Sequence, residues 1–139
     1  MKTLLDIYNE IDNLNIPILS SHFNKKKAGI AQLNNDAIIC VDYSKIQDRK
    51  EEKLMLAEEK AHYETGAYYK DCSPLSIARA EYKARKRMRN ELIPFNELKA
   101  KYKEYGGNIE ELSNYFEVPP EEIAIAEYCY INIEGYASI

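Results

Sequence analysis

The sequence contains no tryptophan and only five glycines and five prolines among its 139 residues. So little glycine and proline argues against extensive disorder. Twelve tyrosines supply most of the aromatic side chains. A tyrosine ring can pack while its hydroxyl group reaches water, which suits a small domain with a thin core. With 45% hydrophobic and 30% charged residues, the composition predicts one soluble globular domain over residues 1–139.

Long apolar runs are also missing from the chain. No stretch of about 18 apolar residues occurs, and an acid stands as early as Asp6, so we expect no membrane span and no signal peptide. Cys40, Cys72 and Cys129 are too far apart for a CxxC zinc motif. Free thiols in a cytoplasmic protein are the simplest interpretation. The net charge of -4 argues against a protein that coats nucleic acid.

Hydrophobic periodicity and turn residues predict an α+β fold in which helices dominate. The expected helices cover about residues 2–13, 49–65, 74–91, 95–105, 109–116 and 121–130. Asp48 is suited to cap the second helix and Gly66 to end it, whereas Ser73 and Pro74 are suited to open the third. Two β-rich runs, 28–33 and 37–43, flank a turn-forming Asn-Asn-Asp sequence. They predict a hairpin in a small antiparallel sheet.

The candidate site is the sequence Glu58-Glu59-Lys60-Ala61-His62. Glu58 and His62 are four residues apart, so on a helix they project from one face and can hold one metal ion. Glu59 lies between them, where it can act as a general base. The pattern corresponds to the H-E-x-x-H motif of zinc peptidases, with a carboxylate in place of the first imidazole. Carboxylate oxygens bind zinc, but the added negative charge weakens the metal as a Lewis acid and broadens its choice toward harder ions such as Mn²⁺.

A third ligand is expected from Glu81, nineteen residues after His62. Its helix face is otherwise apolar and is predicted to pack inward, so the carboxylate needs a metal, a lysine or an arginine as partner. The other residues of that face are Ile77, Ala84, Met88 and Leu92. Taken alone, E-E-x-x-H also occurs by chance in acidic helices, and Lys–Glu pairs on a solvated face explain the same residues.

Two blocks of the sequence resemble the ImmA/IrrE family of metallo-endopeptidases. Residues 54–66 resemble the metal helix of that family. Residues 81–95 are similar to its downstream block, in which a glutamate precedes an alanine by three residues and the helix ends in a short apolar run and proline. Here those positions are Glu81, Ala84 and Leu92-Ile93-Pro94. The resemblance covers about residues 25–95, and it extends more loosely to the helical tail.

This resemblance implies a zincin-like core over about residues 1–95, followed by a helical C-terminal extension over about 96–139. It implies a Zn²⁺ ion held by Glu58, His62 and Glu81, with Glu59 as the catalytic base. Family members of phages and mobile elements cleave or inactivate a helix-turn-helix repressor, which would be the protein substrate here. Small phage-type relatives are expected to share the E-E-x-x-H form, which would make it a working subclass.

Other functions stay open at the level of the sequence. A catalytically inactive zincin-like domain could act by binding a repressor, as an anti-repressor module. The basic residues of 79–89 favour a solvated surface over a nucleic-acid footprint. The tail could pass for a helix-turn-helix, but Glu121 and Glu122 would repel phosphate where a recognition helix meets DNA, so we expect it to pack. His22 is interpreted as a solvated loop residue, with substrate contact as the alternative. Tyr63, Tyr68 and Tyr69 are expected to pack, with oxyanion stabilisation as the alternative role.

Overall fold

The computed structural model describes residues 1–34, 36–66 and 73–139. Within these ranges six α-helices, one 3-10 helix and one three-stranded sheet confirm the α+β class. The helices are α1 (Leu4–Asn13), α2 (Arg49–Thr65), α3 (Pro74–Leu92), α4 (Phe95–Glu104), α5 (Ile109–Phe116) and α6 (Pro120–Asn132). The strands are β1 (Ile18–Ser20), β2 (Ala28–Leu33) and β3 (Asp36–Val41), followed by the 3-10 helix η1 (Tyr43–Lys45). Every predicted helix is present, with ends within two residues of the expected positions.

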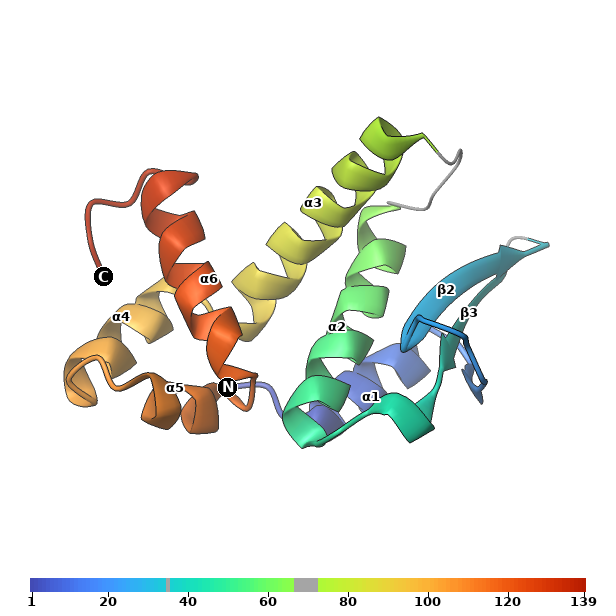
Figure 1. Cartoon of the computed structure of the whole chain (residues 1–139), viewed down its shortest axis with the longest axis horizontal. Helices are drawn as coiled ribbons and strands as arrows, with labels where there is room; N and C mark the ends of the chain where they lie inside the picture. The colour runs from blue at the N-terminus through green and yellow to red at the C-terminus, as the bar shows by residue number, and fades with distance from the viewer. Residues whose placement is uncertain (35, 67–72) are drawn as a thin grey trace.

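The helices α2 and α3 lie side by side at the centre of the molecule (Figure 1). The sheet and α1 lie on one side of this pair, and α4, α5 and α6 lie on the other. One hydrophobic core runs through α1, β3, α2, α3 and the three C-terminal helices. The extension is tied to the rest at Tyr130, whose hydroxyl donates to the Ile93 carbonyl at 2.6 Å, and at Lys53, whose ammonium donates to the Phe116 carbonyl at the end of α5.

The sheet is mixed, so the prediction of an antiparallel sheet was wrong. The expected hairpin is present, with Ala28 opposite Val41, but β1 adds to β3 in parallel, with Ile18 opposite Ile39. Three residues are too few for strand alternation to be recognised, which is why β1 escaped prediction. The second β run also ends at Val41, because Tyr43 begins η1. The strand order β1-β3-β2 leaves β2 at an edge of the sheet.

Local capping defines the two central helices, as the sequence predicted. The Asp48 carboxylate accepts the Glu51 backbone N–H at 2.9 Å, and Gly66 ends α2 with a left-handed φ of 63°. The Ser73 hydroxyl accepts the Ser76 N–H at 3.2 Å where α3 begins. Each side chain satisfies a backbone donor that has no partner within the helix, and glycine adopts the left-handed conformation without strain.

Small side chains line the contact between α2 and α3. Ala57 and Ala61 of α2 and Ala80 and Ala84 of α3 are all buried, which permits a close approach of the two helices. The predicted inward face of α3 is confirmed at Ala84, Met88 and Leu92, which are buried, but was wrong at Ile77, whose side chain is exposed. Ile77 lies in the first turns of α3, where this helix extends past the end of α2 (Figure 1).

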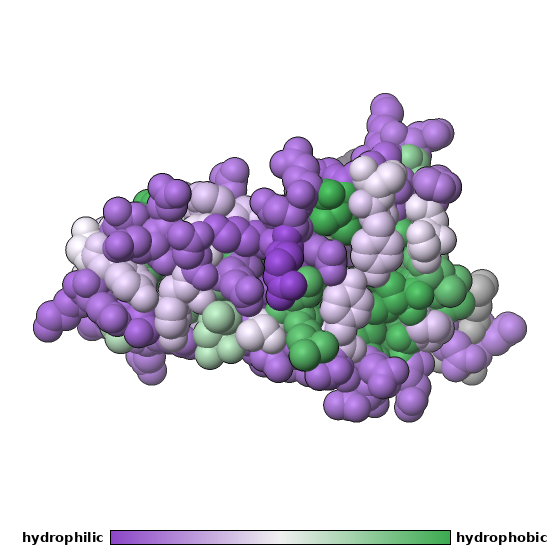
Figure 2. Space-filling view, turned by 90° about the horizontal axis from the view of Figure 1, so that it is seen from below, coloured by the Kyte–Doolittle hydropathy of each residue, from purple (hydrophilic) through white to green (hydrophobic). Residues whose placement is uncertain are grey.

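The surface differs between the two ends of the molecule. Figure 2 shows hydrophobic residues gathered over the half that contains the sheet, whereas the half formed by the C-terminal helices is mostly hydrophilic on this face. Among the described residues, no helix combines the length and the apolar character that crossing a membrane would require.

Candidate metal centre

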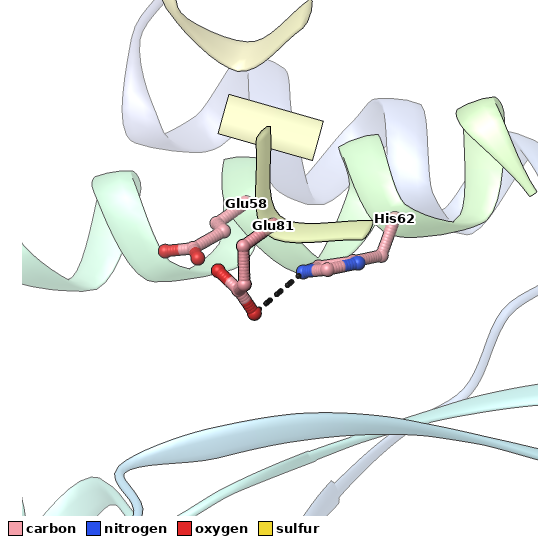
Figure 3. A group of neighbouring side chains, drawn as sticks. All are labelled: Glu58, His62 and Glu81. Carbon is pink, nitrogen blue, oxygen red and sulfur yellow. Dashed lines mark ion pairs between the residues drawn. The ribbon is translucent and has the colours of Figure 1, made fainter. Parts of the chain in front are cut away.

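The three predicted metal ligands lie together where α2 and α3 face the sheet. One ligand atom each from Glu58, His62 and Glu81 can be chosen so that all three lie within 4.8 Å of one another. The His62 Nε2 atom is 3.4 Å from Glu81 Oε1. Figure 3 shows the three side chains pointing to the same side of the helix pair, toward a strand of the sheet. The spacing of four residues in α2 and the packing of α3 against it therefore produce the predicted convergence.

Burial differs between the imidazole and the two carboxylates. The His62 side chain is only 5% exposed, whereas those of Glu58 and Glu81 are each 23% exposed. The ring is therefore held by packing, while the carboxylates open into a cleft of about 630 Å³. Solvent access from the cleft leaves room for a water molecule or a substrate group beside the cluster.

The edge strand β2 forms the opposite wall of this cleft, with residues 28–32 lining it. The Asp42 N–H donates to the Lys27 carbonyl at 2.8 Å, which places this residue pair in hydrogen-bonded register. Since hydrogen-bonded pairs alternate along an antiparallel ladder, the backbone groups of Ala28, Ile30 and Gln32 point away from β3. These groups can pair with an extended peptide chain lying beside β2.

The Glu58 carboxyl has a raised pKa in the absence of a metal ion. Burial is the main cause, and a hydrogen bond with the Glu81 carboxyl adds to it, whereas the Arg85 charge acts in the opposite direction. Two carboxylates that share a site cannot both ionise without cost. A divalent cation would remove that cost and displace the shared proton.

The predicted general base, Glu59, lines the same cleft. Burial, together with the charges of Glu58 and Glu81, raises the pKa of the Glu59 carboxyl to about 8. The exposed Lys26 acts weakly in the other direction. In this environment the group is protonated at neutral pH, and a nearby cation would return it to the carboxylate form that a base requires.

The donor set fits a zinc ion. One imidazole nitrogen and two carboxylate oxygens are all zinc ligands, and three protein ligands with an open fourth position are typical of catalytic zinc sites. The observation that supports this fit is the convergence of the three donors on one point beside an open cleft. The carboxylate at position 58 keeps the ligand position that histidine occupies in H-E-x-x-H.

Arg85 is a member of the site that the sequence did not indicate. Its Nε atom lies 3.3 Å from Glu58 Oε1 and 3.2 Å from Glu81 Oε2. In the sequence, Arg85 is one of the basic residues of 79–89, a run for which a solvated surface was expected. The available signal was its position four residues after Glu81, which puts both side chains on one helix face. We refer to Glu58, Glu59, His62, Glu81 and Arg85 as the metal-site cluster.

A second hollow, of about 920 Å³, lies elsewhere, between α1, α2 and α3. It is larger than the metal cleft, and six of the charged groups that line it pair with one another, whereas the lining residues Lys83 and Lys86 do not join these pairs. Lys60, only 4% exposed, lies 3.0 Å from Glu10, 3.2 Å from Glu64 and 2.6 Å from Glu91. We refer to Lys2, Glu10, Lys60, Glu64, Arg87 and Glu91 as the ion-pair cluster. Its internal charge balance indicates a role in holding the three helices together.

Two other candidate residues, His22 and Tyr63, are not among the residues that line the metal cleft. His22 is 91% exposed and lies 3.7 Å from Asp42, which agrees with a solvated loop position. Tyr63 is exposed, and Tyr68, Tyr69 and Cys72 lie outside the described residues. Cys40 and Cys129 are free thiols. Part of the predicted basic surface is engaged in ion pairs, since Arg85, Lys86 and Arg87 contact Glu58, Glu134 and Glu64 respectively.

The chain was compared with protein-family models, curated proteins and solved structures, and none of them matches it.

Proposed function

We propose that this chain is a zinc-dependent metallopeptidase of the ImmA/IrrE type with a zincin-like fold. The observation that carries the proposal is the convergence of Glu58, His62 and Glu81 within 4.8 Å, with Glu59 in the same cleft. The edge of β2 opposite these residues supports it further, because a peptide substrate needs an extended path past the reacting groups. The chain would act in the cytoplasm on a protein.

Glu58, His62 and Glu81 would hold the ion. When bound, zinc supplies the Lewis acidity that hydrolysis of a peptide bond requires. Glu59 would take a proton from the attacking water and pass it to the leaving amine. The β2 edge would position the peptide in an extended conformation, and the cleft would limit access of bulk water. The sequence resemblance implies a phage-type helix-turn-helix repressor as the substrate.

The test combines metal analysis with one isosteric substitution. The purified chain is expected to contain about one zinc ion per molecule. Glu59→Gln should retain that zinc but lose cleavage of the repressor by 100-fold or more, on the order of the contribution of a general base. Glu52→Gln is a matched control, because Glu52 lies on the same helix but accepts a hydrogen bond from Tyr8 outside the cleft. A chain that binds no zinc, or a Glu59→Gln variant that cleaves normally, would rule the peptidase out.

The second candidate is an inactive zincin-like domain that acts as an anti-repressor by binding. The observation that favours it is the contact of Arg85 with both carboxylates, which holds the cluster together without an ion. This hypothesis predicts a stable complex with the repressor, equal affinity for the wild type and Glu59→Gln, and no cleavage products. Accumulating products without a stable complex would exclude it.

A further inference from the structure

Arg85 spans the two carboxylates of the metal-site cluster. It follows Glu81 by one helical turn on α3 and reaches across to Glu58 on α2. Its guanidinium lies on the open side of the cluster, with 57% of the side chain exposed. An arginine that is this exposed gains little from ion pairs for the stability of the fold. Its contact with two candidate metal ligands at once is therefore more informative about the site than about folding.

Arg85 and His62 contact different oxygens of the Glu81 carboxylate. Glu81 Oε1 faces His62 Nε2 at 3.4 Å, whereas Oε2 of the same carboxylate faces Arg85 at 3.2 Å. Arg85 contacts Glu58 through Oε1, and the hydrogen bond between the Glu58 and Glu81 carboxyls depends on a shared proton that a cation would displace. The guanidinium therefore does not need to leave when a cation is held by His62 and by one oxygen from each carboxylate. Contacts of this kind orient metal ligands and tune the metal.

The charge of Arg85 matches the change from H-E-x-x-H to E-E-x-x-H. A divalent ion with two histidines and one carboxylate leaves one net positive charge at the site. With Glu58 in place of the first histidine, the same ion is neutralised by two carboxylates, and its Lewis acidity falls. One guanidinium in contact with both carboxylates restores the missing positive charge.

We propose that Arg85 is a positioning residue that adapts this site to a carboxylate at position 58. It strengthens zinc binding by fixing which oxygens of Glu58 and Glu81 face the metal, and its charge preserves the Lewis acidity that the additional carboxylate would lower. This inference rests on the metal site of the proposed function. It explains how a site with E-E-x-x-H can keep the ligand geometry and the Lewis acidity that catalysis requires.

The first experiment measures the zinc affinity of the full chain by competition with a fluorescent chelator. Arg85→Gln should weaken zinc binding by about 10- to 100-fold, the usual effect of removing a group that orients metal ligands. Arg87→Gln is the matched control. It removes the same charge from the same helix, is 51% exposed, and contacts Glu64 of the ion-pair cluster. Arg87→Gln should leave the affinity unchanged. Arg85→Lys should recover part of the affinity lost in Arg85→Gln, because an ammonium group can still contact and orient one carboxylate.

The second experiment asks whether Arg85 depends on Glu58. In a Glu58→His background, which restores H-E-x-x-H, Arg85→Gln should weaken zinc binding by only about threefold, because the additional carboxylate is gone. A loss of the same size in both backgrounds would overturn charge compensation. An Arg85→Gln affinity equal to or tighter than wild type would also overturn it, because Arg85 would then be inert or a competitor of the metal. A wild-type chain that binds no zinc, while all variants fold by circular dichroism, would instead refute the underlying metal site.

Discussion

The two charged clusters on the central helix pair are built from the same kinds of residues, yet their charges balance differently. In the ion-pair cluster, Lys2, Lys60 and Arg87 meet three glutamates. In the metal-site cluster, the ion pairs shown by the described residues join Arg85 to two of the three glutamates, Glu58 and Glu81, and the exposed Lys26 acts only weakly on the third, Glu59. A balanced cluster is stable as it stands, whereas a cluster with an excess of carboxylates favours an additional cation. Charge balance, rather than cavity size, therefore distinguishes the structural cluster from the candidate functional site.

The largest effect is expected in the ion-pair cluster, from Lys60→Met. The substitution keeps the volume but leaves three glutamates without their central cation, so unfolding free energy should fall by about 3–5 kcal/mol. Urea unfolding at neutral pH measures the loss. The exposed Lys103→Met serves as the control and should change stability by less than about 0.5 kcal/mol. Equal effects of the two substitutions would contradict a structural role of the ion-pair cluster.

The second largest effect is expected in the stability that zinc adds, which should depend on the metal-site cluster and not on the ion-pair cluster. At a zinc concentration about 100 times the dissociation constant, the wild type should gain about 2.7 kcal/mol of stability. Glu81→Gln should abolish this gain without destabilising the metal-free chain, because it removes a carboxyl that crowds Glu58. Glu91→Gln, in the ion-pair cluster, should do the reverse: it keeps the zinc response and lowers the baseline stability. Thermal melts with zinc and with a chelator distinguish these patterns, and a zinc response that survives in Glu81→Gln would remove Glu81 from the ligand set.

The features that were predicted correctly depend on residues that are close together in the sequence. The caps at Asp48, Gly66 and Ser73, and the convergence of Glu58 with His62, depend on spacings of a few residues, and the structure contains all of them. Glu81 was predicted as a ligand because its carboxylate interrupts an otherwise apolar helix face and therefore needs a partner. In each case the physical cause lies within one helix, so the sequence contains most of the information.

The features that escaped prediction depend on contacts between distant segments. Lys60 belongs to the same E-E-x-x-H stretch, but its burial follows from Glu10 of α1 and Glu91 of α3, which only tertiary packing brings to it. The parallel pairing of β1 with β3 is likewise a nonlocal contact. Arg85 belongs to a run of basic residues, and such runs usually form a solvated surface. Its contact with Glu58 depends on how closely α2 and α3 pack.

The smallest effect is expected in the pH dependence of stability, which tests the excess of carboxylates in the metal-site cluster. Glu59 has a pKa of about 8 in the folded, metal-free chain, against about 4.5 when unfolded. Between these values the folded state holds a proton that the unfolded state has released, so stability falls as pH rises from about 4.5 to 8. The full shift sets an upper limit of about 5 kcal/mol, which partial access to solvent reduces to about 2 kcal/mol.

Glu59→Gln removes this titration while keeping the shape of the side chain. The metal-free variant should match the wild type near pH 5 and exceed its stability by about 2 kcal/mol near pH 8. Urea unfolding at the two pH values in the presence of a chelator measures the difference, and the contribution of Glu58 is common to both proteins. Saturating zinc should shrink the difference, because a nearby cation lets Glu59 ionise in the folded state. Parallel pH profiles for the two proteins would show that Glu59 does not experience the excess of carboxylates, and the contrast between the two clusters would then lose its electrostatic basis.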